Sequence, residues 1–238
     1  MSKYSAVLLL VGVFLLSCSV QSERNKAHKN AVKPNILFVI SDDQSYPHTS
    51  AYGYKAVSTP NFDRIAQTGI LFTKAYVTSP GCSPSRASIL TGRNDWQLEE
   101  AGTHGSSFPA KYEVYPKLLE EAGYKTGYTG KGWGPGDWKI SGRKTNPAGQ
   151  AYNSIKFANQ PEGISNVDYA ENFRQFYTEK KEGQPFCFWF GAHEPHRKFS
   201  KGIGLKNGKR LEEVVVPEFL PDTREIRSDI LDYCFEIE

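Results

Sequence analysis

Continuous apolar runs alternate along the chain with segments in which apolar side chains recur at helical spacing. The runs predict strands at residues 35–40, 70–77 and 186–190, and residues 125–129, which follow a helix end at Gly123, are interpreted as a further short strand. The helical spacing predicts helices at residues 59–69, 83–92, 115–122, 168–181 and 223–238. The run at 35–40 shows no polar alternation, so we expect that strand to be covered on both faces. Strands that alternate with helices predict an α/β fold, with a mainly parallel sheet and helices on both faces.

Local signals mark the ends of several of these elements. Thr59 is suited to cap the helix at 59–69, Pro60 fits its first turn, and Gly69 ends it. Gly123 ends the helix at 115–122 in the same way. Residues 130–149 are rich in Gly, Pro, Lys and Trp, which predicts a long loop.

The beginning of the chain follows a different pattern. A charged start and a short apolar run at residues 6–16 are typical of an export signal, and the run is short for a membrane span. The ending Leu15-Leu16-Ser17-Cys18 resembles a bacterial lipobox, in which Cys18 is lipidated. An ordinary cleaved signal with an incidental cysteine is the alternative. We interpret residues 1–18 as a lipoprotein-type signal peptide and 19–33 as a polar tether. This predicts an exported protein of the bacterial periplasm or outer cell envelope, with a lipid anchor as its only membrane contact.

Charge and cysteine spacing narrow the choice of function. The formal net charge is +3, with both signs interspersed, which argues against nucleic acid as a partner. The four cysteines, at positions 18, 82, 187 and 234, have no spacing typical of a metal knuckle or a disulfide framework. Cys187 in an apolar run and Cys234 in a helical pattern are interpreted as small core residues. Cys82 is left without a structural explanation.

Polar side chains follow three of the predicted strands at the point where each strand ends. Asp42 and Asp43 follow the first strand, Lys131 follows the strand at 125–129, and His193 follows the strand at 186–190. Because ligands of open parallel sheets bind at the carboxyl ends of strands, we expect these residues on one rim. Two adjacent carboxylates suit a hard cation such as calcium or magnesium. Acidic residues after a strand also form turns or cap helices, so this alternative stays open.

Cys82 and Arg86 lie about one helical turn apart in the run Cys82-Ser83-Pro84-Ser85-Arg86. At a helix start, Cys82 would lie beside free backbone N–H groups that favour an anion, and Arg86 can offer a bidentate fork. A buried cysteine with a solvated arginine is the alternative. Together with Leu90-Thr91-Gly92-Arg93, the run resembles the signature of type I sulfatases, a Cys-x-Pro-Ser-Arg core followed by Thr-Gly-Arg. Further stretches that resemble this family are Pro34-Asn35-Ile36-Leu37 with Asp42-Asp43, Gly130-Lys131 and His193-Glu194-Pro195-His196-Arg197.

The resemblance implies an alkaline-phosphatase-like sulfatase fold and is strongest to heparan N-sulfatase-like members. It implies that Cys82 is oxidised to formylglycine by a formylglycine-generating or an anaerobic sulfatase-maturating enzyme. One hydroxyl of the hydrated aldehyde would attack sulfur, and loss of the other hydroxyl's proton would expel sulfate. The residues to which the resemblance assigns catalytic roles are Cys82, Arg86, Lys131 as the sulfate contact and His193 as the general acid. Asp42, Asp43 and the residue made from Cys82 would hold calcium, with magnesium less favoured.

The implied substrate is a sulfated glycan, carrying either a sulfate ester or a sulfamate. By the same resemblance, His196 and Arg197 would shape its pocket. We also expect Trp133, Trp138 and Arg143 of the loop at 130–149 to line that pocket, because indole faces pack on sugar rings and a guanidinium suits sulfate oxygens. A solvent-exposed loop with incidental aromatics is the alternative.

Two features depart from the family pattern. The family has a histidine two residues after the lysine, which helps to deprotonate the hydrate, whereas Trp133 stands at that position here. The family's later Asp-Asn calcium pair has no match in the sequence, so we interpret residues 34–238 as the N-terminal portion of a sulfatase catalytic domain, with its C-terminal part missing.

Two other functions remain possible from the residues alone. A phosphoester or phosphonate hydrolase of the same superfamily would have similar carboxylates near a metal, but phosphatases of that fold use Ser or Thr where Cys82 stands. A catalytically silent, lipid-anchored glycan-binding protein would leave Cys82 unoxidised.

Overall fold

The computed structural model describes residues 32–238. The signal peptide, Cys18 and nearly all of the predicted tether lie outside the described residues. Within the described part of the chain, no helix combines the length and the apolar character needed to cross a membrane. The strands and helices of the described residues belong to the unit formed by residues 36–238.

Three parallel strands form the sheet, in the order β1-β3-β2. They are β1 (Ile36–Ile40), β2 (Lys125–Gly130) and β3 (Phe186–Gly191). The central strand β3 pairs Phe188 with Leu37 of β1 on one side and with Gly127 of β2 on the other. The predicted parallel sheet is therefore confirmed, and β3 brings together segments that lie far apart in the sequence.

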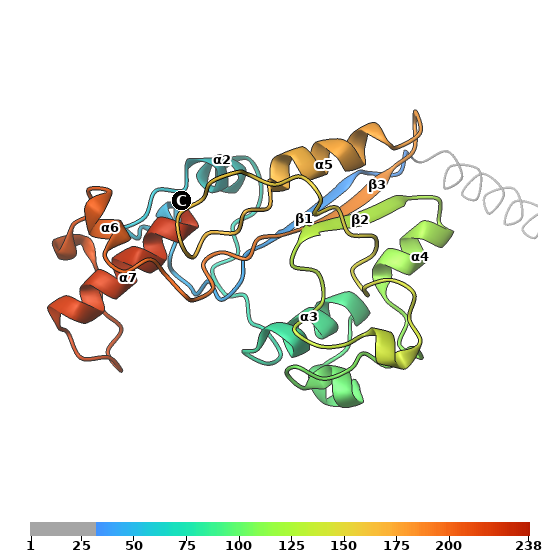
Figure 1. The fold of residues 1–238 in the computed structure, drawn as a ribbon, viewed down its shortest axis with the longest axis horizontal. Helices are drawn as coiled ribbons and strands as arrows, with labels where there is room; N and C mark the ends of the chain where they lie inside the picture. Colours follow the sequence, from blue (N-terminus) through green and yellow to red (C-terminus); the bar gives the residue numbers. More distant parts are fainter. Residues whose placement is uncertain (1–31) are drawn as a thin grey trace, which may run out of the picture. The chain divides into compact units, whose positions relative to one another are not determined.

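Helices cover both faces of β3, as predicted (Figure 1). On one face, Phe186 and Phe188 pack against Phe176 of α5 (Tyr169–Thr178). On the other face, Trp189 shares a core with Ala87 and Leu90 of α3 (Cys82–Thr91), against which Tyr115 of α4 (Tyr115–Glu121) also packs. Successive side chains of a strand point to opposite faces, so the uninterrupted apolar run of β3 supplies both cores.

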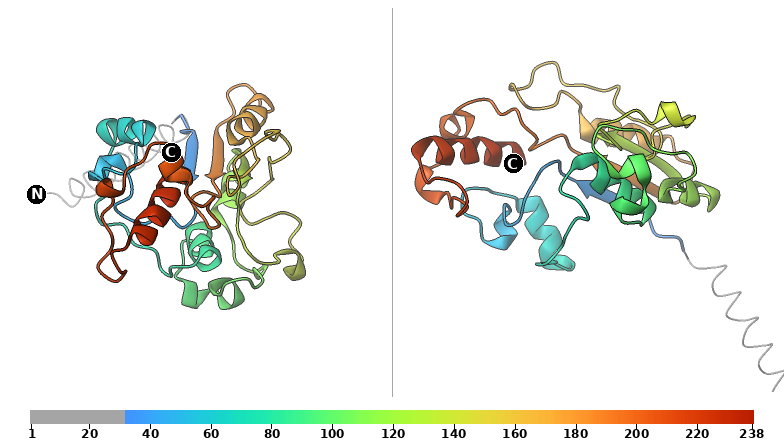
Figure 2. Two further views of the ribbon diagram at one scale, coloured as in Figure 1. Left: turned by 60° about the vertical axis from the view of Figure 1, so that its left-hand side comes forward. Right: turned by 90° about the horizontal axis from the view of Figure 1, so that it is seen from below.

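The other helices and turns lie outside the sheet and the helices that cover it. They are α2 (Pro60–Thr68), α6 (Ile203–Lys206) and α7 (Arg224–Ile237), together with short 3-10 turns η1 (Ser50–Tyr52), η2 (Asp95–Gln97), η3 (Glu99–Gly102), η4 (Lys139–Ser141) and η5 (Leu211–Glu213). Helices α6 and α7 lie side by side in both views of Figure 2. The buried Asp232 carboxylate of α7 accepts hydrogen bonds from the backbone N–H groups of Gly202 and Gly204 at the start of α6, at 2.8 and 2.9 Å. The Thr223 hydroxyl caps α7 by accepting from the Ile226 N–H.

Two predictions about strands are wrong. Residues 70–77 form no strand, and the side chains of Ile70 and Tyr76 are 80% and 88% exposed. An apolar run adopts a strand only where a partner strand accepts its hydrogen bonds, and this run finds none among the described residues. The strand β1 is not covered on both faces either, since Leu37 and Val39 are 49% and 60% exposed. Within residues 32–238, no helix packs over that side of β1. The core assignments of Cys187 and Cys234 are confirmed, with 3% and 0% exposure.

Candidate active site

The carboxyl ends of the three strands meet at one rim. The N–H of Ala192, after β3, donates to the Ile40 carbonyl at 3.0 Å, and the N–H of Asp42 donates to the Glu194 carbonyl at 3.0 Å. The N–H of Lys131, after β2, donates to the Gly191 carbonyl at 2.7 Å. These bonds hold the three segments that leave the sheet against one another, as expected for the ends of parallel strands.

Gly130 allows this close approach. Its φ of +70° lies in the left-handed region, and a Cβ atom there would lie 1.9 Å from the Gly191 carbonyl oxygen. Only glycine avoids both the conformational cost and the collision. The carbonyl of the next residue, Lys131, accepts from the Trp189 indole at 3.0 Å and from the Arg86 guanidinium at 2.7 Å. The Lys131 backbone is thereby fixed at the rim.

Asp42 is the centre of a buried charge network. Its side chain is 4% exposed, and its two carboxylate oxygens accept from Arg86 at 3.1 Å and from Lys131 at 2.5 Å. The other guanidinium nitrogen of Arg86 donates to the carbonyls of Lys131 and Gly132. Two cations with full hydrogen bonding compensate the cost of burying the carboxylate. The sequence-level alternative of a solvated Arg86 is excluded, because this side chain is 2% exposed.

Helix α3 places Cys82 in its first turn, after the extended Gly81. Arg86 follows one turn later on the buried side of the helix. The glycine at the other end, Gly92, has a φ of +66° and ends the helix as predicted. The helix start leaves backbone N–H groups near Cys82 without intrahelical partners, a surrounding that favours an anion.

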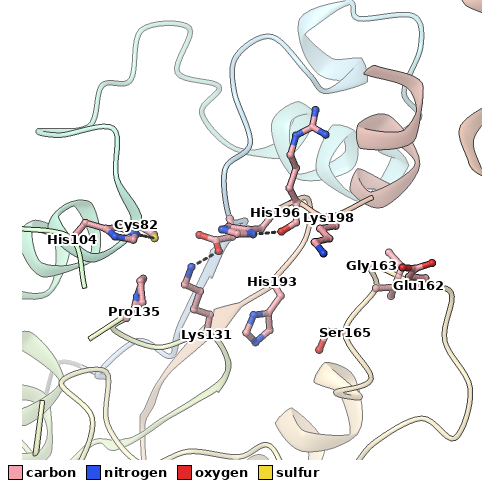
Figure 3. Close-up of a pocket in the computed structure, with 14 residues that line it drawn as sticks. Cys82, His104, Lys131, Pro135, Glu162, Gly163, Ser165, His193, His196 and Lys198 are labelled. Atoms are coloured by element: carbon pink, nitrogen blue, oxygen red, sulfur yellow. Dashed lines mark hydrogen bonds and ion pairs between the residues drawn. The ribbon is translucent and has the colours of Figure 1, made fainter. Parts of the chain in front are cut away.

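A cavity of about 870 Å³ opens at this rim (Figure 3). It is lined by the predicted site residues Asp42, Cys82, Lys131, His193, His196 and Arg197, and by Gly134 and Pro135 of the long loop. Its other lining residues are His104, Glu162, Gly163, Ile164, Ser165 and Lys198. Figure 3 shows Cys82 with His104 on one side of the cavity and Glu162, Gly163 and Ser165 on the other.

His193 lies at the edge of the cavity beside the charge network. Burial lowers the pKa of its imidazole, and the positive charges of Lys131 and Arg86 lower it further, while Glu194 and Asp42 act in the opposite direction. The backbone N–H of His193 donates to the Tyr169 hydroxyl at 3.0 Å. A lowered pKa makes the protonated imidazole a stronger acid but leaves a smaller fraction of it protonated near neutral pH, so the position of His193 at the cavity, not its pKa, is what suits it to protonate a leaving oxygen.

Glu194 connects this edge to the far wall. Its carboxylate accepts from the Ser165 N–H at 2.7 Å and from the Tyr169 hydroxyl at 2.9 Å. Its own carbonyl holds the Asp42 N–H. Glu194, the second residue of the run 193–197, therefore has a positioning role between the carboxylate network and the segment 162–165.

Asp43 and His196 lie together nearer the surface. Asp43 has a φ of +61°, and its carboxylate lies 3.6 Å from the Nε2 atom of His196. Arg197 turns to Asp229 of α7, with which it forms a two-point ion pair. His196 and Arg197 line the cavity, whereas Asp43 is not among its lining residues, and the Arg197 side chain already has a carboxylate partner.

The expectation that Trp133, Trp138 and Arg143 line this cavity is corrected, since none of them is among its lining residues. Trp133 is 3% exposed and packs edge-to-face on Phe108. Arg143 donates to the carbonyls of Phe108, Pro109 and Tyr112, and Trp138 packs against the same core. The apolar surface of the two indoles is better covered by that core than by solvent, so the loop folds inward.

Sequence reasoning missed His104, the segment 162–165 and Lys198. The Nε2 atom of His104 lies 3.3 Å from the Cys82 Sγ atom. His104 belongs to no periodic pattern, and the only available signal was that it is one of five histidines in the chain. Histidines are frequent at catalytic sites, but this fact alone does not select one of them.

The oxygen donors of Asp42 and Asp43 have the right chemistry for a hard cation, but their number is small. Calcium takes about six to eight oxygen ligands. Within residues 32–238, no group of three or more His, Cys, Asp or Glu side chains is placed to hold a metal ion. Both Asp42 oxygens also accept from cationic side chains. The described residues therefore place two neighbouring carboxylates at this rim and do not form a complete calcium site.

Known proteins resemble this chain over the segment that carries the site residues. A family profile described as Sulfatase matches residues 34–210, which include the whole rim, Cys82 and the run 193–197. The chain belongs to the sulfatase family. An N-acetylglucosamine-6-O-sulfatase of Bacteroides thetaiotaomicron is 33% identical over 211 residues, a match that covers 82% of this chain and 36% of that protein. The human N-sulphoglucosamine sulphohydrolase is 29% identical over 230 residues, covering 82% of this chain and 42% of the sulfatase.

Solved structures of sulfatases share this fold. One, described as a complex with its substrate D-glucosamine-2-N,6-O-disulfate, superposes with a TM-score of 0.57 at 26% identity. The superposition covers 81% of this chain and 39% of that sulfatase. A Bacteroides fragilis structure has a TM-score of 0.63 at 18% identity, covering 87% of this chain and 56% of the other. The chain thus spans well under two thirds of the length of these relatives.

Proposed function

We propose that the protein hydrolyses sulfate esters or sulfamates on sulfated glycans, with the residue made from Cys82 as nucleophile. The observation that carries this proposal is the position of Cys82. It lies in the first turn of α3 and lines the same cavity as Asp42, Lys131 and His193. Neither a structural thiol nor a disulfide accounts for a half-buried free cysteine beside free helix N–H groups and a charge network.

Formylglycine at position 82 would supply a hydrated aldehyde, of which one hydroxyl would attack sulfur and the other, by losing its proton, would expel sulfate. The rest of the chemistry falls to residues of this chain. The ammonium of Lys131 binds sulfate oxygens at the rim and is held there by Asp42. His193, which lines the cavity beside Lys131, donates a proton to the leaving oxygen of the glycan. Arg86 has a positioning role, since its guanidinium donates hydrogen bonds to the Asp42 carboxylate and to the Lys131 carbonyl.

Asp42 and Asp43 are the residues that would contribute to a calcium site, and the bound cation would help to neutralise the sulfate charge. Because the described residues do not complete its coordination, we derive no step from it.

The glycan would extend from Lys131 and His193 toward the segment 162–165 and Lys198. The cavity has Lys131 near one end and the Glu162 carboxylate with its backbone segment near the other. Such a lining is suited to a charged, polar sugar. The relatives named for glucosamine derivatives point to an amino sugar as the first substrate to examine.

The experiment is to produce the complete protein together with a formylglycine-generating enzyme and to supply D-glucosamine-2-N,6-O-disulfate. Ion chromatography measures released sulfate, and the structure of the desulfated sugar distinguishes an O-sulfatase from a sulfamidase. Mass spectrometry of the peptide that contains position 82 is expected to show loss of the thiol and gain of a carbonyl. Cys82→Ala serves as the inactive control. Quantitative alkylation of Cys82 without any sulfate release would instead favour the silent glycan-binding protein.

A further inference from the structure

Cys82 has a neighbour that no sequence pattern assigned. The Nε2 atom of His104 lies within hydrogen-bonding range of the Cys82 Sγ atom, at 3.3 Å. Both side chains line the cavity that also contains Lys131 and His193 (Figure 3). A nucleophile and a base within hydrogen-bond reach of each other form the arrangement by which enzymes activate a hydroxyl or a thiol.

Ser83 ties the segment that carries His104 to the helix that carries Cys82. Its hydroxyl accepts from the N–H of Gly105 at 3.4 Å and donates to the Pro135 carbonyl at 2.5 Å. The Ser83 side chain has no solvent exposure, so water does not compete for these hydrogen bonds. The residue after His104 and the residue after Cys82 are therefore joined directly, which keeps the two side chains side by side.

Other groups near Cys82 are engaged elsewhere. Trp133, two residues after Lys131, has no basic atom, is buried, and donates its indole N–H to the Ser83 carbonyl at 3.1 Å. The imidazole of His196 contacts the Arg197 carbonyl and lies beside Asp43. Of the three histidines that line the cavity, His104 is the one in contact with Cys82.

We propose that His104 is the base that removes a proton from the side chain of residue 82. The proposal rests on the proposed function. In this step, the O–H bond of the free hydroxyl on the sulfated, hydrated side chain breaks, and the proton passes to Nε2 of His104. The electron pair of that bond forms the C=O bond of the aldehyde. The bond between the same carbon and the sulfate oxygen breaks, and sulfate leaves with its electron pair. Addition of water to the aldehyde then restores the two hydroxyls.

The test compares His104→Ala and His104→Gln with the wild type in the complete, formylglycine-containing protein. Lys111→Ala is the matched control, an exposed change in the same chain segment that removes surface contacts with Glu99 and Tyr112 and none with the cavity. With D-glucosamine-2-N,6-O-disulfate, we expect sustained sulfate release by the His104 variants to fall about 10²–10⁴-fold. A single equivalent of desulfated sugar should still form, and the peptide containing residue 82 should retain one sulfo group by mass spectrometry.

Wild-type turnover by the His104 variants would overturn the proposal. Loss of turnover without a retained sulfo group would also overturn it, because a variant with a merely misfolded site accumulates nothing on residue 82.

A second measurement does not depend on the substrate or on conversion of the thiol. In protein made without the formylglycine-generating enzyme, iodoacetamide alkylation of Cys82 should be several-fold slower in His104→Ala than in the wild type or Lys111→Ala, because the imidazole assists removal of the thiol proton. Equal alkylation rates in folded proteins would contradict the proposal. A wild type that keeps its thiol and releases no sulfate would refute the proposed function instead, and the alkylation rates would still decide whether His104 accepts a proton from residue 82.

Discussion

Arg86 and Asp42 form a buried ion pair, with 3.1 Å between the Nη2 and Oδ1 atoms and side-chain exposures of 2% and 4%. Removing one member of such a pair leaves the other charge buried with incomplete compensation. We predict that Arg86→Ala lowers the free energy of unfolding by about 3–5 kcal/mol, measured by urea denaturation. Arg197→Ala is the control, since its pair with Asp229 is exposed and should contribute under about 1 kcal/mol. Equal losses in the two variants would show that burial does not set the value of the Arg86 contact.

Gly130 and Gly92 form a matched pair of positions for testing close packing at the rim. Both have positive φ angles, +70° and +66°, but an added Cβ would collide with the Gly191 carbonyl only at Gly130. Gly92→Ala should cost about 1–2 kcal/mol for the left-handed conformation alone. Gly130→Ala should cost clearly more, and it should also reduce sulfate release because it displaces Lys131. Thermal unfolding of both variants measures the difference, and similar melting temperatures would contradict the assigned collision.

Glu236 of α7 gives a pH dependence of stability. Its side chain is buried, and neither carboxylate oxygen has a hydrogen-bond partner among the described residues. Burial, together with the nearby charges of Glu194 and Asp232, raises the pKa of Glu236 from 4.5 to about 7. At pH values between 4.5 and about 7, the folded protein therefore binds more protons than the unfolded chain. This contribution to stability is therefore present below pH 4.5 and is lost as the pH rises through about 7.

Glu236→Gln should accordingly raise the melting temperature at pH 8 more than at pH 5, because the amide cannot ionise. Differential scanning fluorimetry at the two pH values checks this, with Glu182→Gln at an exposed position as the control. A Glu236→Gln effect that is the same at both pH values would contradict the raised pKa.

Calcium binding provides a test of the partial ligand set. Because two adjacent carboxylates leave most of a calcium coordination shell open, we predict weak binding, poor solubility and no turnover by the 238-residue chain alone. The exposed apolar side chains Leu37 and Val39 on β1 add to the predicted insolubility. In a chain that continues past Glu238, we expect tighter calcium binding, better solubility and measurable turnover. Calorimetric calcium titration of both chains measures the difference, and tight binding by the 238-residue chain would show that it holds a complete site.

Cys18 tests the proposed export route. We predict that the wild type expressed in a bacterial host incorporates labelled palmitate and fractionates with membranes, because two or more acyl chains give stable attachment. Cys18→Ser should remove the label and release the mature domain into the soluble fraction. Retention of the label by this variant would rule out lipidation at Cys18.

The sequence by itself determined the parts of this protein that depend on local pattern. Apolar runs predicted β1 and β3, and helical patterns predicted the five helices α2, α3, α4, α5 and α7, because burial of a face imposes a period on the chain. The short strand β2 was predicted from its position after the helix end at Gly123. The convergence of Asp42, Lys131 and His193 was also predictable, because the carboxyl ends of parallel strands meet at one edge. The spacing of Cys82 and Arg86 placed them one helical turn apart, and the structure keeps that relation.

Contacts without a period were decided only by the tertiary structure. Residues 70–77 have a strand-like composition but no partner strand among the described residues, so they form no strand. Trp133 lies on a loop that was expected to line the cavity, yet its indole gains more by packing on Phe108 than by facing the cavity. His104 is 22 residues from Cys82 along the chain and reaches it through loop packing held by Ser83. Such a contact depends on how irregular segments fold against a helix, and neither hydrophobic periodicity nor motif spacing records that information.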